Sequence, residues 1–415
     1  MDRNMSENAQ RDMVHEIVMS AQITDMHTHL FPPSFKNLQM SGADNVLTYH
    51  YLIAESMRVG RISYESFFSM DLKTQAEFIW ERLFQTMTPL SEAASGVAQI
   101  AQMMGVHLRR DGLSGFREAL TADADDAYVD KVLSLAGVEH LVMTNDPFSD
   151  EEQSYWKSGA PLHPRFHAAL RLDPLVNTFE DVIPLLVKQG YSVTSRLTDE
   201  TVSQVTRFLE DCVERIRPVY VAFSASDTFE FGEEDSRSQL LRRVVLPLCE
   251  ERRLPLALMI GAKRRVNPGL QSAGDSTGKA SIQPVERLCR EYPNNKFLVS
   301  LLSRENQHEL AVTARKFDNL MPFGCWWFLN TESLIDEITR MRLELLGPTF
   351  VAQHSDARVL EHVLYKWQLS RKVIADVLSD KYEALSKRGW PVTRADVERD
   401  VAALFGKNFW DFIAR

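Results

Sequence analysis

Two histidines one residue apart, His27 and His29, end the apolar stretch ITDMHTHL near the start of the chain. Side chains alternate between the two faces of a β-strand, so this spacing places both imidazoles on one face. Two imidazoles on one face can share a metal ion, whereas the same spacing on a helix would separate them. For an isolated pair, one packed and one solvent-facing histidine is the alternative. Residues further along the chain must therefore decide between the two interpretations.

The composition is that of an ordinary globular protein with an acidic balance. The 415 residues are 44% hydrophobic and 25% charged, and the net charge of −10 argues against a nucleic-acid partner. The longest apolar run, LPLALMIGA, is too short to span a membrane, and the first twenty residues lack the apolar core of a signal peptide. The four cysteines are scattered and form no C-x-x-C pair, which indicates buried, reduced thiols. We expect a cytoplasmic protein that binds neither membrane nor nucleic acid.

Short apolar runs rich in β-forming residues recur along the chain, and amphipathic stretches typical of helices lie between most of them. The eight runs are ITDMHTHL, VEHLVMTNDP from Val138, FHAALRLDP from Phe166, VYVAFSASD from Val219, LPLALMIGAKR from Leu254, KFLVSLLSREN from Lys296, LMPFGCWWF from Leu320 and FVAQHSDAR from Phe350.

Alternation of strand and helix predicts a parallel sheet, and continuous apolar runs indicate strands covered on both faces. Eight units favour an α/β fold of the (β/α)₈ TIM-like barrel type, in which the chemistry gathers at the carboxyl ends of the strands. No G-x-G-x-x-G follows any run, which disfavours an open dinucleotide-binding sheet. We expect one barrel domain over residues 1–415, with a helical insertion at about residues 31–135 after the first strand.

In such a barrel the first and eighth strands are neighbours, so Asp356 at the end of the eighth run would approach His27 and His29. Two imidazoles and a carboxylate form a plausible Zn²⁺ site with open positions for water or substrate. The alternative is that Asp356 caps the helix that follows it.

The chain resembles the amidohydrolase superfamily through TDMHTHL on the first strand and the aspartate on the eighth. Within that superfamily, TYHY, LRLDP, IGAKR, CWWF and SDAR resemble the uronate isomerases, also called glucuronate isomerases, over nearly the whole chain. These enzymes interconvert D-glucuronate with D-fructuronate, and D-galacturonate with D-tagaturonate.

The resemblance implies that His27, His29 and Asp356 hold one divalent metal, most simply Zn²⁺. Many relatives carry a histidine where this chain has Met259, and a thioether is a poor ligand for such a cation. A site with a single metal and few protein ligands follows. The resemblance also implies a substrate pocket lined by His50, Tyr51, Arg171, Arg264, Trp326 and Arg358.

A hexuronate is a small anion, and the planar fork of arginine matches its carboxylate. Arg171, Arg264 and Arg358 each lie at the end of a predicted strand and could converge at the carboxyl end of the barrel. An ion pair with Asp173 is the alternative for Arg171, and a solvated basic run is the alternative for Arg264.

Isomerisation moves a proton between C1 and C2 through an enediol, which requires an acid or base and an electrophile at the oxygens. Tyr51 and His50 are candidate proton carriers, with ordinary helix packing as their alternative. Asp356 could help to open the sugar ring, and Arg358 or the metal could stabilise the oxyanion. We expect Trp326 to face the pocket and Trp327 the helices, and we count Asn306 and Glu305 as candidates for sugar hydroxyl contacts.

Two other functions remain open. A metal-dependent hydrolase or decarboxylase acting on a carboxylated substrate would use the same ligands. A barrel that binds sugar acids without catalysis would have no need of Asp356 beside the histidine pair. A homo-oligomer is compatible with the sequence, which does not determine the number of subunits.

Overall fold

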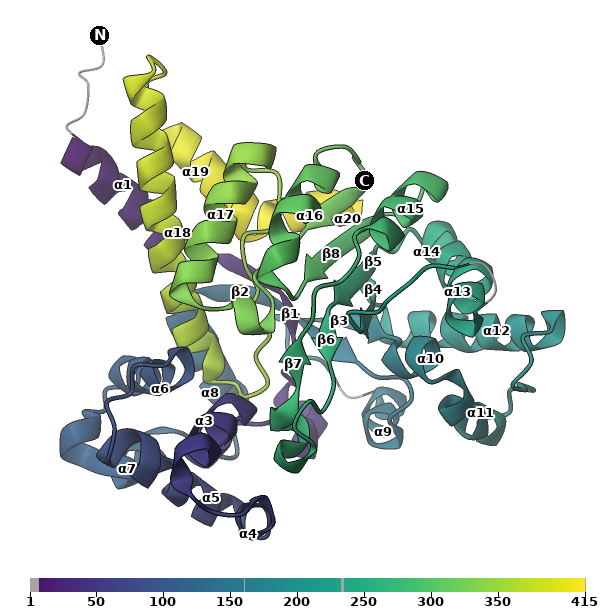
Figure 1. Cartoon of the computed structure of the whole chain (residues 1–415), viewed down its shortest axis with the longest axis horizontal. Coiled ribbons are helices and arrows are strands. Elements are labelled where there is room, and N and C mark those ends of the chain that lie inside the picture. The colour runs from purple at the N-terminus through teal and green to yellow at the C-terminus, as the bar shows by residue number, and fades with distance from the viewer. Residues whose placement is uncertain (1–6, 160, 233–234, 415) are drawn as a thin grey trace.

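The chain folds around a curled parallel sheet with helices on its outside, as the computed structural model of residues 7–159, 161–232 and 235–414 shows (Figure 1). The sheet has seven strands in the order β1-β2-β3-β4-β5-β8-β9. Their bounds are β1 Ile23–Thr28, β2 Val138–Asn145, β3 Phe166–Arg171, β4 Val221–Ala225, β5 Leu256–Ile260, β8 Phe297–Leu301 and β9 Leu320–Pro322. These seven coincide with the first seven apolar runs of the sequence, so the predicted α/β barrel class is confirmed.

The eighth run is not a regular strand. It forms one parallel bridge, from Val351 to Phe323, on one side. On the other side it reaches β1, where His29 N donates to Ala357 O at 2.7 Å and Asp356 N donates to His27 O at 3.2 Å. This segment therefore closes the barrel between β9 and β1 while its backbone remains irregular.

Between β1 and β2 the chain forms a group of helices. Their bounds are α2 Ala43–Leu47, α3 His50–Gly60, α4 Tyr64–Phe68, α5 Leu72–Trp80, α6 Glu92–Met103, α7 Leu108–Ala119 and α8 Asp126–Ala136. After β5, β6 Ala262–Lys263 and β7 Ser276–Thr277 form a small hairpin, and the segment between them contacts α3 and α4. Asn267 Nδ2 of this segment donates to Tyr64 Oη of α4 at 2.9 Å. Figure 1 shows this hairpin and α3 to α5 at the same end of the molecule.

The remaining helices surround the sheet or close its far end. Those that follow the inner strands are α9 Asp150–Ser158, α10 Asp173–Asn177, α11 Phe179–Lys188, α12 Asp199–Ile216, α13 Ser236–Leu240, α14 Leu246–Arg252, α15 Gln283–Glu291, α16 Gln307–Ala314 and α17 Glu332–Leu346. The chain begins with α1 Glu7–Ser20 and ends with α18 His362–Lys387, α19 Arg394–Ala402 and α20 Asn408–Ala414.

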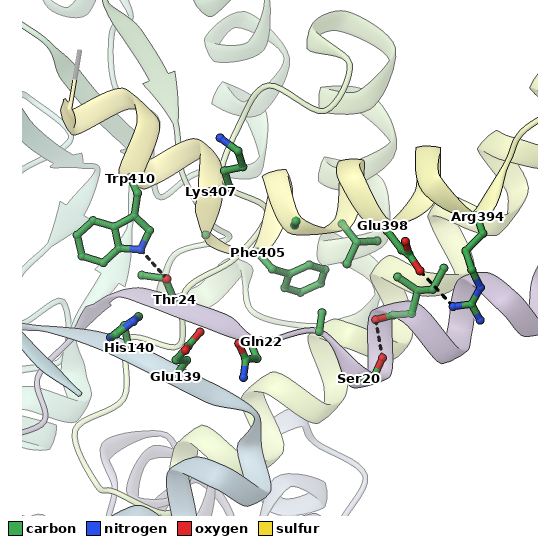
Figure 2. Close-up of a pocket in the computed structure, with 15 residues that line it drawn as sticks. Ser20, Gln22, Thr24, Glu139, His140, Arg394, Glu398, Phe405, Lys407 and Trp410 are labelled. Atoms are coloured by element: carbon green, nitrogen blue, oxygen red, sulfur yellow. Dashed lines mark hydrogen bonds and ion pairs between the residues drawn. The ribbon is translucent and has the colours of Figure 1, made fainter. Parts of the chain in front are cut away.

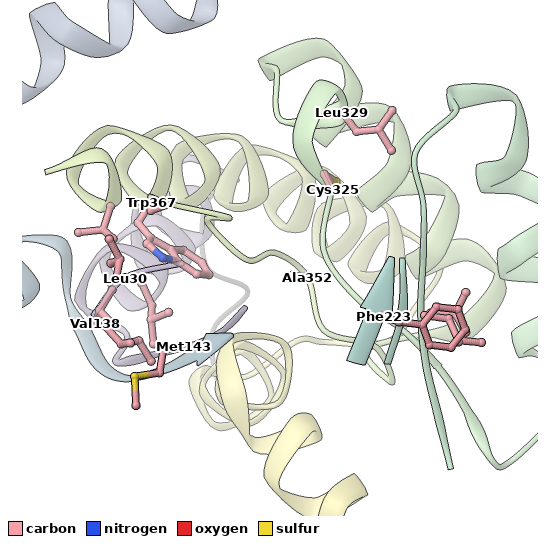
Figure 3. Close-up of a cluster of buried hydrophobic side chains, with 14 of the residues drawn as sticks. Leu30, Val138, Met143, Phe223, Cys325, Leu329, Ala352 and Trp367 are labelled. Atoms are coloured by element: carbon pink, nitrogen blue, oxygen red, sulfur yellow. The ribbon is translucent and has the colours of Figure 1, made fainter. Parts of the chain in front are cut away.

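Two apolar layers hold the barrel. The outer layer lies between the strands and the helices, and Figure 3 shows part of it, including Leu30, Phe223 and Trp367. The inner layer fills the barrel with side chains such as Met26 and Met259, and Phe409 of α20 packs under it. Met259 is thus a core residue with 2% exposure, in agreement with its exclusion as a ligand.

Among the described residues, no helix has both the length and the apolar character needed to cross a membrane.

Candidate active site

The structure brings His27, His29 and Asp356 together at the carboxyl end of β1. One ligand atom from each residue lies within 4.8 Å of the other two. Nε2 of His29 is 3.3 Å from Oδ1 of Asp356, and Nε2 of His27 is 3.8 Å from the same oxygen. The three side chains come from both ends of the sequence because the barrel closes between its first and last segments.

A hydrogen bond to Tyr220 sets which nitrogen of His27 is free. The Tyr220 hydroxyl donates its single proton to Met26 O at 2.8 Å. It lies 3.1 Å from His27 Nδ1, so it must accept the hydrogen of that nitrogen. Nε2 of His27 is left with a lone pair that points toward Asp356, as a metal ligand requires.

His29 is oriented in the same way by Thr144. Thr144 Oγ1 donates to Thr28 O at 3.1 Å and lies 2.8 Å from His29 Nδ1. Burial lowers the pKa of His27 to about 3 and that of His29 well below its usual value, so both rings are neutral near pH 7. Two neutral imidazoles thus direct free Nε2 atoms at one carboxylate.

Asp356 occupies an unusual backbone conformation for a non-glycine residue, with φ of +51°. The preceding residue is held by Asp25, whose carboxylate accepts from Ser355 N at 2.9 Å and from Trp367 Nε1 at 2.8 Å. Asp25 is fully buried, and burial raises its pKa to about 6. Its bonds anchor the segment that presents Asp356.

These residues fit a divalent metal. Oδ1 of Asp356 is buried and has no hydrogen-bond partner among the described residues. An acceptor in that position is costly unless a cation or donor compensates it. Two neutral imidazoles and one carboxylate form a donor set with open positions, which suits a catalytic metal.

The three predicted arginines have different partners. Arg171 is joined to Asp173 by two bonds of 2.9 and 3.0 Å, as its alternative interpretation proposed. Arg264 is joined to Asp275 at 2.6 Å. Both line a cavity of about 420 Å³ at the ends of β3 to β5. Arg358 is exposed and has no carboxylate within ion-pair distance in the described part of the chain.

His50 and Tyr51 begin helix α3 of the insertion. Trp327 Nε1 donates to His50 Nε2 at 3.1 Å, so the hydrogen of a neutral His50 ring lies on Nδ1. Burial, and to a smaller extent the nearby Arg358, lower the pKa of His50 to about 3. His50 is therefore a neutral hydrogen-bond donor, while burial raises the pKa of Tyr51 well above its usual value.

The two consecutive tryptophans, Trp326 and Trp327, are both buried next to the site. Trp327, which we expected to face the helices, contacts His50 and also lies under the Arg264 guanidinium at 5.7 Å. Trp327 has φ of +50°, another rare conformation near the site. Trp326 lies beside it with ring centroids 5.9 Å apart, and its part in substrate binding stays a prediction.

Asn306 is fully buried, and its side chain already has several partners. It accepts from Ala280 N at 3.0 Å and donates to Ala280 O at 2.8 Å and to Glu309. Glu305 accepts from the Ser303 hydroxyl. Both residues therefore have evident structural contacts, and a role in sugar binding stays a prediction for each.

A second cavity, of about 580 Å³, lies at the opposite end of the barrel (Figure 2). Its lining includes Thr24 and His140 near the starts of β1 and β2, and Trp410 of α20, whose indole donates to Thr24 at 2.9 Å. None of the predicted site residues lines it. The carboxyl ends of the strands, where His27, His29 and Asp356 meet, remain the candidate active site.

Sequence reasoning missed the residues that support the ligands. Asp25, Thr144 and Tyr220 all lie in apolar runs that were predicted as strands. A charged or hydroxyl-bearing residue inside such a run is a signal that could have identified them, because a buried polar group needs a partner.

A parallel barrel with two imidazoles and a carboxylate at the ends of its first and last segments, where they could hold a metal ion, is the arrangement of an enzyme of the amidohydrolase type. No family model matches the chain, and no curated protein matches its sequence. A crystal structure of a uronate isomerase from Bacillus halodurans C-125 superposes with a TM-score of 0.96 and 49% identity, over 99% of this chain and 97% of that chain. The chain belongs to the uronate isomerase family.

More distant structures share the fold. A uronate isomerase from Thermotoga maritima has a TM-score of 0.77 and 15% identity, over 97% of each chain. A glucuronate isomerase from Caulobacter crescentus has a TM-score of 0.75 and 14% identity, over 100% of this chain and 95% of that chain. The match to the Bacillus halodurans structure confirms, at the level of the family, the resemblance found in the sequence motifs.

Proposed function

We propose that this chain is a uronate isomerase that interconverts D-glucuronate with D-fructuronate and D-galacturonate with D-tagaturonate. The observation that carries the proposal is the 49% identity, over 99% of the chain, to the uronate isomerase of Bacillus halodurans. The convergence of His27, His29 and Asp356 supports it from the chemistry of the site.

A single Zn²⁺ held by His27, His29 and Asp356 suits this donor set. When bound, it would supply Lewis-acid stabilisation to substrate oxygens. The support for a single ion is that the three ligand atoms converge on one point and Met259 occupies the inner core.

Arg358 is the strongest candidate to bind the substrate carboxylate. Its guanidinium keeps its fork of donors available, whereas those of Arg171 and Arg264 already bond to Asp173 and Asp275. Arg171 and Arg264 remain candidates to bind the substrate hydroxyls, or to bind the carboxylate together with Arg358, since both line the cavity beside the site.

We assign the movement of the proton between C1 and C2 to Tyr51. His50 carries its hydrogen on Nδ1 and is neutral, so it is suited to donate a hydrogen bond to a substrate oxygen. The hydroxyl of Tyr51 is buried and has no partner among the described residues, so it is available to exchange a proton with the substrate. An enediol is the intermediate of such a transfer.

The test is incubation of the purified protein, supplied with Zn²⁺, with ¹³C-labelled D-glucuronate and D-galacturonate. Nuclear magnetic resonance should show the ketose product growing to equilibrium, and His27→Ala should abolish it. Release of carbon dioxide without a ketose would instead support the decarboxylase alternative. A cytoplasmic location and a homo-oligomeric state stay predictions, which cell fractionation and light scattering test.

A further inference from the structure

A flap that follows β5 joins the barrel to the helical insertion beside the candidate active site. The flap comprises residues 262–277, which are β6, β7 and the segment between them, and that segment contacts α3 and α4. Figure 1 shows β6 and β7 at the same end of the molecule as α3 to α5. The flap carries Arg264, one of the proposed substrate-binding residues, so whatever holds the flap also places this side chain.

The base and the two arms of the flap are held by bonds that do not involve the insertion. Directly after the flap, Gly278 N donates to Gly261 O at 2.9 Å. Asp275 joins the two arms, because it accepts from Arg264 Nη1 at 2.6 Å and from Arg265 N at 2.8 Å. The flap therefore keeps much of its own shape, and its contact with the insertion lies at its tip.

Tyr64, the first residue of α4, holds this tip. Its hydroxyl accepts from Asn267 Nδ2 at 2.9 Å. Its ring packs so closely on Gly269 that a Cβ there would come within 2.3 Å of ring atom Cδ2, an approach that a residue without a side chain permits. Asn267 follows Arg264 by three residues, so the position of the tip determines the course of the arm that carries Arg264.

The contact at the tip contributes more to the placement of Arg264 than to the stability of the fold. Tyr64 is 40% exposed and Asn267 is partly exposed, and a hydrogen bond between such groups adds little stability. The guanidinium of Arg264, by contrast, lies 5.7 Å from the centre of the Trp327 ring, and the Trp327 indole donates to His50. A displaced tip would move Arg264 away from this group of site residues.

We propose that Tyr64 is a positioning residue for the isomerisation, which holds the tip of the flap on the insertion and thereby holds Arg264 at the substrate pocket. This inference rests on the proposed function, in which Arg264 contacts the substrate. A side chain that is already ordered loses less freedom when the substrate binds, so binding is tighter. Loss of Tyr64 should therefore weaken substrate binding and leave the chemical step almost unchanged.

The first test is Tyr64→Ala in the full chain, supplied with Zn²⁺ and D-glucuronate. KM should rise by about fivefold or more while kcat changes by less than about twofold, because binding is lost equally from the ground state and the transition state. In an Arg264→Ala background, the same change should not raise KM further, since Tyr64 acts through Arg264. An unchanged KM in Tyr64→Ala, or an equal rise in both backgrounds, would overturn the inference.

Tyr191→Ala is the matched control. Tyr191 lies between α11 and α12, is also partly exposed, and donates its hydroxyl hydrogen to Asp211 at 2.5 Å. Its removal should change the melting temperature about as much as Tyr64→Ala does, but it should leave KM unchanged. A rise of KM in both variants would show that the loss of a surface tyrosine acts generally and not through the flap.

A disulfide across the same contact should rescue the function. A Cβ at Gly269 would lie 3.1 Å from Cγ of Tyr64, the atom bonded to the Tyr64 Cβ, so Tyr64→Cys with Gly269→Cys is compatible with disulfide geometry. The four native cysteines are buried and do not compete. The reduced double variant should have the raised KM of Tyr64→Ala, and oxidation should return KM toward the parent value.

The outcomes of the disulfide experiment separate positioning from movement. Mass spectrometry establishes that the bond has formed, and its failure to form would contradict the close contact of Tyr64 with Gly269. Activity that disappears on oxidation and returns with dithiothreitol would show that the flap must leave the insertion during turnover. That result would overturn a positioning role.

Hydrogen–deuterium exchange needs no turnover and separates this inference from the proposed function. Amides of residues 264–274 should exchange about tenfold faster in Tyr64→Ala than in the parent, because the released flap opens more often. Equal exchange in both proteins contradicts the role of Tyr64. Failure of the parent to form any ketose, together with faster exchange in the variant, contradicts the proposed function instead.

Discussion

The hydroxyl of Tyr220 lies 3.1 Å from Nδ1 of His27 and accepts its hydrogen, which leaves Nε2 of His27 free on the side of Asp356. Tyr220 can do this because its own proton goes to Met26 O at 2.8 Å. A side chain on the fourth run thus fixes the tautomer of His27 on the first run, across the inside of the barrel.

We expect Tyr220→Phe to weaken metal binding by about ten- to a hundredfold, the usual effect of removing a partner behind a ligating histidine. Competition with a chromogenic chelator measures the affinity. Tyr382→Phe is the control, since that buried hydroxyl donates to Asp400 at 3.0 Å, away from the ligands. Equal metal affinity in the two variants would show that Tyr220 does not orient His27.

The metal stoichiometry follows from the convergence of three ligands on one point. Elemental analysis should find about one divalent metal per chain in the purified protein and almost none in His27→Ala. His140→Ala serves as a control, because His140 lines the cavity at the opposite end of the barrel. Two equivalents per chain, or full retention in His27→Ala, would refute the proposed site.

Replacement of the arginines by lysine tests which one binds the carboxylate. Lysine keeps the charge but loses the planar fork, so Arg358→Lys should lower kcat/KM by about tenfold or more. Arg171→Lys and Arg264→Lys should have smaller effects, because Asp173 and Asp275 already occupy those guanidinium groups. Near-normal kcat/KM in all three variants would mean that the carboxylate is bound elsewhere.

Glu152, beside the end of β2, makes stability depend on pH. It is 3% exposed, and burial raises its pKa to about 7 despite bonds from Asp146 N and Asn145. A raised pKa means that the folded state binds the proton more tightly than the unfolded state. The stabilisation that the folded state gains from the protonated Glu152 is complete below the pKa of the unfolded state, near 4.5. It is lost as the pH rises through 7, the pKa of the folded state.

We therefore expect the free energy of unfolding of the parent, relative to Glu152→Gln, to decrease between pH 4.5 and pH 7 by on the order of 3 kcal/mol. Urea denaturation of both proteins at pH 5 and pH 8 measures the change. Glu151→Gln, one residue away and exposed, should show no such dependence. A difference that is constant with pH would contradict the raised pKa.

The first seven strands were predictable because each is a continuous apolar run that the barrel covers on both faces. The eighth run was only partly predictable. Its backbone turns at Asp356, where φ is +51°, and Ala352 N bonds to Leu404 O instead of to a strand. Such bonds depend on residues far apart in sequence, which the local pattern does not contain.

The candidate site also contains some features that the sequence could predict and others that it could not. The H-x-H spacing carries its own geometry, so the convergence of His27 and His29 could be expected from the sequence. The backbone conformation of Trp327 could not be expected, because its φ of +50° departs from the extended backbone of a strand. Arg171 and Arg264 ended where expected, but only the structure shows that acidic partners already hold them.

The final prediction concerns how the hydrogen moves between C1 and C2. A hydride shift usually relies on a metal clamp on both oxygens, and often on two ions, whereas this site offers three ligands at one point. The buried hydroxyl of Tyr51 is an exchangeable carrier without a competing partner in the described chain. A proton held on such a group can exchange with water before it returns to the substrate.

The reaction run in D₂O should therefore place solvent deuterium at C1 or C2 of the product, as detected by nuclear magnetic resonance. Tyr51→Phe should slow this incorporation and the turnover together, because the carrier is removed. Tyr382→Phe, which changes a hydroxyl bonded to Asp400, should alter neither. Full retention of the substrate's own hydrogen after many turnovers would point to a hydride shift or a shielded carrier. Normal turnover in Tyr51→Phe would move the role to His50 or Asp356.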